Sequence, residues 1–311
     1  MSLAATPGTG PNTSPLAVIK IRPPRAAWDE LPAHRTLVMG ILNVTEDSFS
    51  DGGRYLSADA AIAHGLELVR AGADIVDVGG ESTRPGAEPV PEDVELSRVL
   101  PVVTALVATG AVVSVDTTHV STARACIKAG AHLINDVSGL THEEGMPALI
   151  AETGVPYVLM HRRGDARTMN GLSEYADTVS EVTAELTQLR DRFLAAGVEP
   201  GQIILDPGVG FAKDAAQNWE LLRATSHFAS LGHRLLVGTS RKRFLGSLLG
   251  GEGLPNEPVD RDAATAATSA LGAAAGAWAV RVHDVAASRD AVRVAAAWGG
   301  APVPADAGGA E

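Results

Sequence analysis

Residues 203–210 read IILDPGVG: three large apolar side chains lead into Asp206, and the chain then turns at Pro207 and Gly208. A continuous apolar run of this kind is typical of a strand that is buried on both of its faces. An acid at the end of such a strand costs free energy unless it is paired. Asp206 therefore needs either a partner within the protein or a ligand.

The same kind of apolar run recurs along the chain. Eight runs, at intervals of roughly 20 to 45 residues, lie at Leu37–Leu42, Asp74–Val78, Val112–Val115, His132–Ile134, Pro156–Met160, Gln202–Leu205, Arg234–Val237 and Trp278–Val280. Segments with apolar residues at helical spacing lie between or after them, at residues 57–72, 91–110, 121–130, 174–197 and 283–298. We expect Ser57 to cap the first of these helices and Gly72 to end it.

Strand alternating with helix eight times predicts an α/β protein with a parallel (β/α)8 TIM barrel in a single domain. An open, doubly wound sheet is the alternative architecture. We place the catalytic domain at residues 35–299, after a flexible N-terminal extension at residues 1–34 that is rich in Pro, Gly, Ser and Thr. Residues 300–311 are predicted to form a flexible tail.

Polar residues end or follow nearly every apolar run. They are Asn43, Asp77 with Glu81 beyond it, Asp116, Asn135 with Asp136, His161, Asp206, Ser240 with Lys242, and Arg281 with His283. A turn or a helix cap explains a single acid after a strand equally well. In a parallel barrel, however, all strand ends open onto one face, where active sites lie. The set therefore predicts one polar bowl.

Three of these side chains suit the edge of a planar heterocycle. A carboxylate accepts two N–H donors, and a carboxamide matches an edge that carries both donors and acceptors. Asp206, Asp116 and Asn135 are therefore predicted to read an amide-like ring such as an amino-pyrimidinone, with Met160 and Phe211 as apolar walls.

The cations suit a diphosphate. Arg281 and His283 stand two residues apart, so both side chains can point to the same side of a strand. Together with Arg84 they could bind pyrophosphate, and Lys242 follows a buried strand close to the start of a helix.

Two long loops follow the first two runs. The segment VTEDSFSDGG, residues 44–53, is either a polar loop or a mobile lid that carries Phe49 and Asp51 over a substrate. In the second loop, Asp77 and Glu81 are either paired carboxylates for acid–base chemistry or anchors that accept backbone N–H groups. We favour the anchoring role.

Composition excludes several kinds of partner. The net charge is 25 − 37 = −12, which disfavours nucleic acid and anionic membranes. The single cysteine, Cys126, cannot pair within the chain and is interpreted as a buried hydrophobe in a reducing cytoplasm. No signal peptide and no membrane span are apparent.

Motif searches narrow the chemistry further. The sequence has no Walker loop, no G-x-G-x-x-G after a strand and no G-x-S-x-G, which disfavours a nucleotide kinase, a Rossmann dehydrogenase and a serine hydrolase. His-x-x-x-His and clustered cysteines are also missing. Mg²⁺ can still bind through one oxygen ligand together with phosphate and water.

Eight segments together resemble the pterin-binding family and, within it, the dihydropteroate synthases of the bacterial folate pathway. They are MGILNVTEDSFSDGG, ADIVDVGGESTRPGA, VVSVDTTHV, LINDVSG, YVLMH, ILDPGVGFAK, GTSRKRFLG and RVHDV, within residues 36–298. The resemblance implies a (β/α)8 barrel enzyme, a transferase that condenses 6-hydroxymethyl-7,8-dihydropterin diphosphate with p-aminobenzoate. The products are 7,8-dihydropteroate and pyrophosphate.

The resemblance also implies roles for residues. The pterin ring is bound by Asp116, Asn135, Met160, Asp206, Phe211, Lys242 and Arg281, of which Arg281 stacks on it. Pyrophosphate is bound by Asn43, Arg84, Arg281 and His283, with Mg²⁺ on Asn43. The p-aminobenzoate is bound by Phe49, Thr83, Pro85, Lys242 and Arg243, where many relatives have serine in place of Arg243.

The implied mechanism is an SN1-like displacement in which cations stabilise the departing pyrophosphate and the aniline nitrogen attacks a pterin-methyl cation. Its catalytic residues are Asp51, Arg84, Lys242, Arg281 and His283. The resemblance further implies a homodimer. The alternatives are a pterin-binding methyltransferase, an inactive paralogue acting as a scaffold, and an unrelated barrel acting on sugar phosphates.

Overall fold

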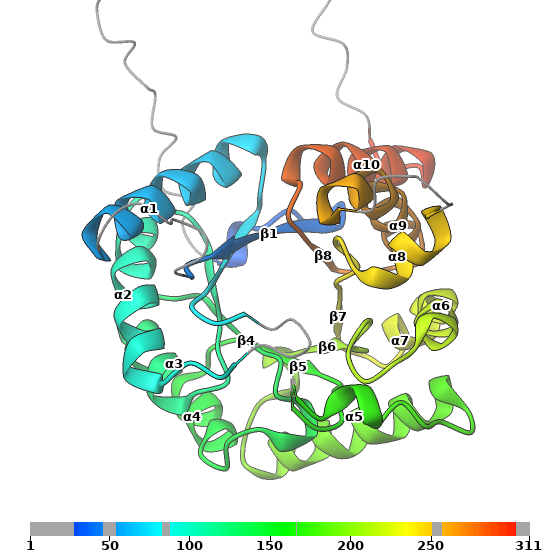
Figure 1. The fold of residues 1–311 in the computed structure, drawn as a ribbon, viewed down its shortest axis with the longest axis horizontal. Coiled ribbons are helices and arrows are strands. Elements are labelled where there is room, and N and C mark those ends of the chain that lie inside the picture. The colour runs from blue at the N-terminus through cyan, green and yellow to red at the C-terminus, as the bar shows by residue number, and fades with distance from the viewer. Residues whose placement is uncertain (1–27, 46–53, 83–87, 166, 251–256, 303–311) are drawn as a thin grey trace, which may run out of the picture.

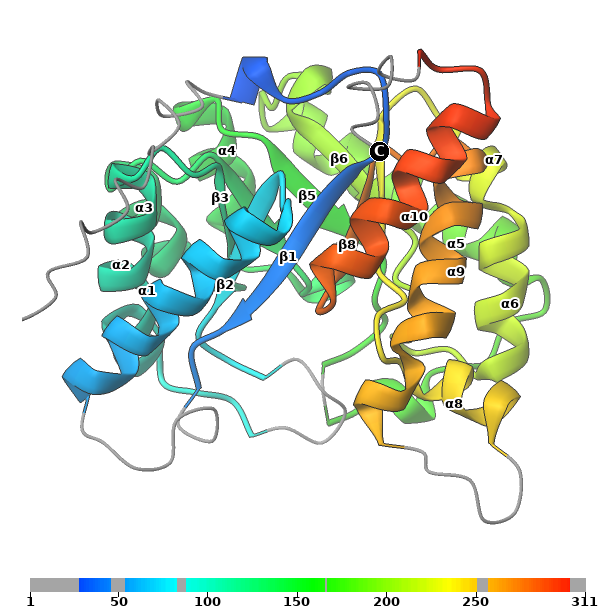
Figure 2. The same cartoon turned by 90° about the horizontal axis from the view of Figure 1, so that it is seen from above.

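The computed structural model of the chain describes residues 28–45, 54–82, 88–165, 167–250 and 257–302. Its strands form a closed parallel barrel in which each strand pairs with the next along the chain and β8 pairs with β1 (Figure 1). Helices surround the barrel on its outer side (Figures 1 and 2). The predicted (β/α)8 barrel is thus confirmed, and the open sheet is excluded.

Each predicted apolar run forms one strand. The strands are β1 (Leu37–Asn43), β2 (Ile75–Gly79), β3 (Val113–Asp116), β4 (Leu133–Asp136), β5 (Tyr157–Met160), β6 (Ile203–Asp206), β7 (Arg234–Val237) and β8 (Ala279–Val282). Almost every strand residue is buried, because one face of each strand meets the barrel interior and the other meets the helices.

The helices lie where apolar residues recur at helical spacing. They are α1 (Arg54–Ala71), α2 (Glu92–Ala108), α3 (Val120–Lys128), α4 (Met146–Thr153), α5 (Thr178–Ala195), α6 (Ala215–Arg223), α7 (Thr225–Ala229), α8 (Arg243–Leu249), α9 (Asp262–Ala274) and α10 (Val285–Trp298). One predicted cap is wrong: α1 begins at Arg54, so Ser57 lies inside the helix. In the described part of the chain, no helix combines the length and the apolar character that crossing a membrane requires.

Side chains alternate between the two faces of every strand, and this alternation builds two apolar layers. Inside the barrel, one buried cluster contains Leu133, Val158 and Ile204. A larger cluster fills the space between strands and helices. Residues two positions after the inner cluster face the same interior, one layer nearer the carboxyl ends of the strands.

The opposite end of the barrel is closed by aromatic packing. The 3-10 helix η1 (Trp28–Glu30) lies at this end, away from the arrowhead of β1 (Figure 2). The Trp28 ring is 5.5 Å from the Trp278 ring, and both pack against the inner cluster. The segment predicted as a flexible extension thus includes a packed turn at residues 28–30, while residues 1–27 and 303–311 of the predicted flexible ends lie outside the described residues.

An ion pair joins the beginnings of β1 and β2. Arg35 donates two hydrogen bonds to the buried carboxylate of Asp74, at 2.7 and 2.8 Å, and the Val38 amide donates a third at 2.9 Å. We expect Asp74→Ala to lower the free energy of unfolding by about 3 kcal/mol, because a guanidinium and an amide lose their acceptor. Urea denaturation measures this loss. The exposed Asp59→Ala is the control, and a loss below about 1 kcal/mol would contradict the prediction.

Candidate functional site

Polar residues occupy the inward-facing layer directly above the apolar interior of the barrel. Leu133 is followed two positions later by Asn135, and Ile204 by Asp206. Strand pairing sets Asp116 beside Asn135 and Met160 beside Asp206. The predicted convergence of these strand ends follows from the register of the barrel.

Arg281 bridges two acids across this layer. From β8, its Nε donates to Asp77 Oδ2 on β2, and its Nη2 donates to Asp116 Oδ2 on β3, both at 2.6 Å. Burial disfavours the charged guanidinium, but Asp77 and Asp116 outweigh burial and raise the pKa of Arg281. The site therefore contains a fixed cation between two carboxylates.

Asp77 has a different role from the predicted one. It is fully buried and accepts hydrogen bonds from Asn135 Nδ2, at 2.9 Å, and from Arg281. Within the described residues it therefore fixes side chains of the site, and no backbone N–H group donates to it. Its second oxygen, Oδ1, has no hydrogen-bond partner among the residues that the structure describes. Glu81 does accept from a backbone amide, that of Val90, at 3.4 Å.

Asp116 and Asp206 are both buried acids with raised pKa values. For Asp116, burial raises the pKa to about 7 against the opposing effect of Arg281, and the neighbouring Asp77 adds to the rise. For Asp206, burial raises the pKa while Lys242 lowers it. Asp206 Oδ1 also accepts from the Gly208 amide at 2.7 Å. Both acids can gain free energy from a ligand that offers N–H donors.

Lys242 lies beside the apolar wall. Its Nζ is 4.7 Å from the centre of the Phe211 ring and donates to the carbonyl of Val209. Burial lowers the pKa of Lys242 to about 8, against the opposing effect of Asp206. Lys242 ends the β7 loop at the start of α8, where Arg241 adopts a left-handed conformation (φ 57°) and forms a bidentate pair with Asp262.

His283 is fixed by a serine from the neighbouring strand end. Ser240 Oγ accepts from the His283 amide at 3.0 Å and lies 2.9 Å from Nδ1 of the ring. A hydroxyl that accepts from the amide can donate to Nδ1, so Ser240 sets the orientation of the imidazole.

Other predicted residues lie farther out or outside the described chain. Asn43 is exposed at the end of β1, and Arg243 is exposed at the first position of α8. Five predicted residues lie outside the described residues: Phe49, Asp51, Thr83, Arg84 and Pro85.

Behind Phe211 lies a chain of hydrogen-bonded ionisable residues whose mutual contacts were not predicted from the sequence. His161 is fully buried, and its two ring nitrogens lie 2.8 Å from Glu185 Oε2 and 3.0 Å from Lys213 Nζ. Lys213 is the last residue of ILDPGVGFAK, and His161 ends YVLMH. Both lay within recognised segments, but nothing in their local sequence indicates that they contact each other.

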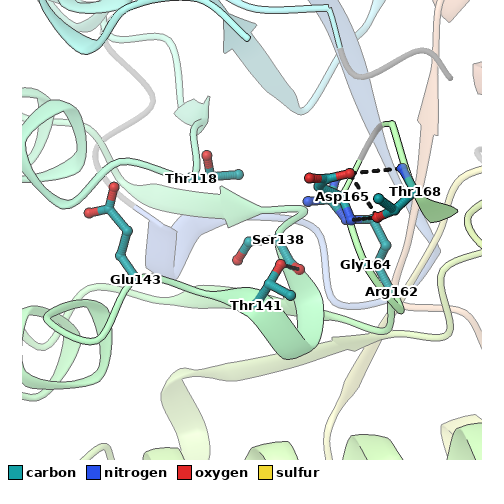
Figure 3. A pocket seen from close by; sticks show the side chains of 8 residues that line it. All are labelled: Thr118, Ser138, Thr141, Glu143, Arg162, Gly164, Asp165 and Thr168. Atoms are coloured by element: carbon teal, nitrogen blue, oxygen red, sulfur yellow. Dashed lines mark hydrogen bonds between the residues drawn. The ribbon is translucent and has the colours of Figure 1, made fainter. Parts of the chain in front are cut away.

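A separate hollow of about 420 Å³ lies among the loops that follow β3, β4 and β5 (Figure 3). Arg162 and Ser138 line it; each is buried, and Arg162 Nε and Ser138 Oγ find no hydrogen-bond partner in the described ranges. Glu143 lies across the hollow from Arg162 (Figure 3). Asp116, Asn135 and Asp206 do not line it, so it is distinct from the polar layer inside the barrel.

The polar layer can bind a planar ring through its acids and its amide, while Arg281, Lys242 and His283 supply positive charge or hydrogen-bond donors at the rim. These groups serve electrostatic stabilisation and positioning.

Comparison with known proteins gives a consistent result. The sequence matches the family of pterin binding enzymes over residues 39–283. It is 53% identical over 263 residues to the dihydropteroate synthase of Mycobacterium leprae, covering 84% of this chain and 93% of that one. It is 45% identical to the dihydropteroate synthase of Bacillus subtilis, with 86% and 89% covered.

Solved structures that resemble this chain come from the same group of enzymes as its sequence relatives. The dihydropteroate synthase of Xanthomonas albilineans with 4-aminobenzoic acid superposes with a TM-score of 0.79 at 44% identity, covering 86% of this chain and 94% of that one. The same enzyme in complex with 7,8-dihydropteroate gives a TM-score of 0.76 at 41% identity, with 86% and 95% covered. The chain belongs to the family of pterin binding enzymes.

Proposed function

We propose that this protein is a dihydropteroate synthase, which joins 6-hydroxymethyl-7,8-dihydropterin diphosphate to p-aminobenzoate and releases pyrophosphate. The observation that carries the proposal is the inward layer of Asp116, Asn135 and Asp206 joined to Arg281, in a chain that is 53% identical to a dihydropteroate synthase. A barrel acting on sugar phosphates has no need of these ring-reading groups.

The ring is recognised by hydrogen bonds in a buried site. Asp206 accepts from the adjacent ring N–H and amino group of the pterin, and the carboxamide of Asn135 meets an edge with mixed donors and acceptors. Met160 and Phe211 contact its faces. Because both acids are costly to keep charged in the empty site, the donors of the ring offset this cost on binding.

The diphosphate faces one cation and one ring that can donate a hydrogen bond. Arg281 and His283 stand at the end of β8, where negative charge develops as the bond to the pterin methylene breaks. Lys242 adds positive charge beside the ring. The chain holds the methylene carbon in place for the aniline nitrogen, and no covalent nucleophile is required.

Magnesium is the cofactor we propose, with Asn43 as its protein ligand. The amide oxygen of Asn43 is a hard donor, and the side chain is exposed at the end of β1. The described residues contain no group of three or more His, Cys, Asp or Glu side chains able to hold a metal. A single amide oxygen from Asn43 fits Mg²⁺, because this ion takes few protein ligands and completes its coordination shell with phosphate and water. When bound, Mg²⁺ neutralises charge on the diphosphate.

For the second substrate we propose Phe49, Thr83 and Pro85 as binding residues, together with Lys242 and Arg243. Asp51 and Arg84 belong to the same two loops and complete the proposed catalytic set. Arg243, which is exposed, is close enough in sequence to Lys242 to meet the carboxylate of p-aminobenzoate.

A homodimer is the assembly we propose. Helices α8 and α9 lie on the same flank of the barrel (Figures 1 and 2), and both contact the 3-10 helix η6 (Pro258–Arg261). Exposed large apolar residues on these two helices are Leu248, Leu249 and Leu271. Such residues are typical of an association surface. Analytical ultracentrifugation tests the proposal, and a monomer at micromolar concentration would exclude it.

The lone buried Cys126 supports a cytoplasmic location.

Pyrophosphate release tests the function directly. With the pterin diphosphate, Mg²⁺ and p-aminobenzoate present, we expect stoichiometric release of pyrophosphate and formation of dihydropteroate. Omission of p-aminobenzoate should suppress both. A protein that binds the pterin but forms no product would be an inactive paralogue or a methyltransferase, and the proposal would fail.

The pH dependence of kcat/KM should be bell-shaped. Asp116 must be a carboxylate to accept N–H donors, so activity rises as pH increases through its pKa of about 7. Lys242 must be charged, so activity falls as pH increases through its pKa of about 8. Initial rates under subsaturating pterin diphosphate measure the profile. A flat profile across this range would contradict both assignments.

A further inference from the structure

A buried hydrogen-bond chain runs from Glu185 through His161 to Lys213, directly behind the loop that carries Phe211. Glu185 Oε2 lies 2.8 Å from His161 Nε2, and Lys213 Nζ lies 3.0 Å from His161 Nδ1. Glu185 is held from its other side by Arg163. Among the residues that the structure describes, no side-chain hydrogen bond joins this chain to a proposed ring-reading side chain, and Lys213 instead donates to carbonyls of the loop.

The protonation of the chain follows from its partners. Burial, and next the positive charge of Lys213, lower the pKa of His161 to about 4, so its ring is neutral at neutral pH. Although burial opposes it, hydrogen bonding to His161 and Arg163 lowers the pKa of Glu185 to about 2, so Glu185 is an acceptor. His161 must then donate from Nε2 to Glu185, which assigns Nδ1 as the acceptor of a hydrogen bond from Lys213.

The ammonium of Lys213 is matched by three acceptors. Besides His161 Nδ1, its Nζ donates to the carbonyl of Gly208 at 3.1 Å and to the carbonyl of Phe211 at 2.8 Å. An ammonium has three N–H donors and no acceptor, so the charged form of Lys213 is fully satisfied. A neutral amine has only two donors and would turn its lone pair toward one of these oxygens or toward Nδ1.

The loop at residues 208–212 needs stabilising contacts of this kind. Gly208, Gly210 and Ala212 all adopt left-handed backbone conformations, with φ values of 69°, 82° and 50°, and that of Ala212 is costly for a residue with a side chain. The same loop carries Phe211 and presents the Val209 carbonyl to Lys242. It also offers the Gly208 amide to Asp206. Its conformation therefore sets the positions of three groups of the proposed pterin site.

We propose that Lys213 is a positioning residue for pterin binding, which holds the Gly208–Phe211 loop through its three hydrogen bonds and is itself oriented by His161 and Glu185. The inference rests on the proposed function, because the loop matters only if Phe211 and Asp206 meet a pterin.

The three hydrogen bonds that Lys213 donates depend on pH. Burial lowers the pKa of Lys213 to about 7, Asp206 and Glu185 oppose this effect, and Lys242 and Arg163 add to it. Since the folded-state pKa is depressed, the ammonium is present below this pH and is lost as pH rises through it. The contribution of Lys213 to pterin affinity should therefore decrease as pH rises above neutral.

Isothermal titration of the full-length protein with pterin diphosphate, at pH values from one unit below the Lys213 pKa to two units above it, tests the proposal. Lys213→Met keeps the length of the side chain and removes its donors. We expect it to raise Kd by ~10-fold at the acidic end, equivalent to about 1.4 kcal/mol. The ratio of the two Kd values should fall toward one at the alkaline end. Changes from Lys242 and Asp116 are common to both proteins and cancel in this ratio.

Two further variants separate positioning from loss of the fold. Lys213→Arg retains a permanent charge, so we expect tighter binding than in Lys213→Met and no loss of its advantage at alkaline pH. Lys128→Met, at an exposed lysine on α3, should leave Kd unchanged. Thermal unfolding identifies any variant that is not folded. If Lys213→Met does not fold, the pH dependence of the Kd of Lys213→Arg relative to that of the native protein tests the proposal.

The outcomes distinguish this inference from the proposed function. If the native protein and Lys213→Met bind pterin diphosphate equally well, and the ratio of their Kd values is constant across pH, the positioning role is overturned and the proposed function is left intact. Native protein that binds no pterin overturns both. The role of Lys213 is supported if the Kd of Lys213→Met divided by that of the native protein is large at acidic pH and declines through neutral pH. The advantage of Lys213→Arg over Lys213→Met should show no such decline.

Discussion

Replacing Arg281 by methionine should lower kcat/KM by about 10³-fold or more, which is comparable to the loss of a main electrostatic donor in an active site. Two effects combine. The diphosphate loses its cation at the end of β8, and Asp77 and Asp116 lose the guanidinium that donates to both at 2.6 Å. Without that charge the pKa of Asp116 rises further, so it is protonated at neutral pH and no longer accepts from the ring.

Steady-state kinetics with both substrates measures this loss. Arg70→Met, at an exposed arginine near the end of α1, is the matched control and should retain native rates. Circular dichroism establishes that the Arg281 variant folds. A folded variant with less than ~10-fold loss in kcat/KM would show that Arg281 has a structural role only.

Removal of the Asp206 carboxylate should weaken pterin binding by ~10²-fold while the barrel still folds. Asp206 is the acceptor proposed for two adjacent donors of the ring, and a charge-assisted bidentate pair in a buried site is worth about 3 kcal/mol, or ~10²-fold in Kd. The fold should survive, because burial raises the pKa of this acid and so makes its charge a cost in the empty protein.

Calorimetric titration of Asp206→Ala with pterin diphosphate measures the effect. Asp206→Asn, which keeps the shape but offers a mixed donor and acceptor, should also bind poorly. Asp93→Ala, at an exposed acid on α2, should bind as the native protein does. An unchanged Kd in Asp206→Ala would mean that the acid has been misassigned.

The strands were predictable because their signal is local. A strand that is buried on both faces reads as a continuous apolar run, so each run indicated one strand, and the observed ends differ from the predicted ones by no more than two residues. The start of α1 was not predictable from Ser57, because a residue of capping type does not exclude another turn of helix before it.

The site was only partly predictable. Asp116, Asn135 and Asp206 were identified from their positions after apolar runs, and barrel closure places them in one layer. The partners of Asp77 were not predictable, since Arg281 is 204 positions away and meets it only across the closed barrel. The contact between Lys213 and His161 was missed for the same reason: it joins two loops that are 52 positions apart.

A crystal structure with 6-hydroxymethyl-7,8-dihydropterin diphosphate bound most directly tests whether the inward layer of the barrel is the pterin site. The expected result is a ring between Met160 and Phe211 whose N–H groups donate to Asp206, with the diphosphate at Arg281 and His283. A ring bound elsewhere, such as in the hollow beside Arg162, with Asp206 making no contact to it, would contradict the assignment.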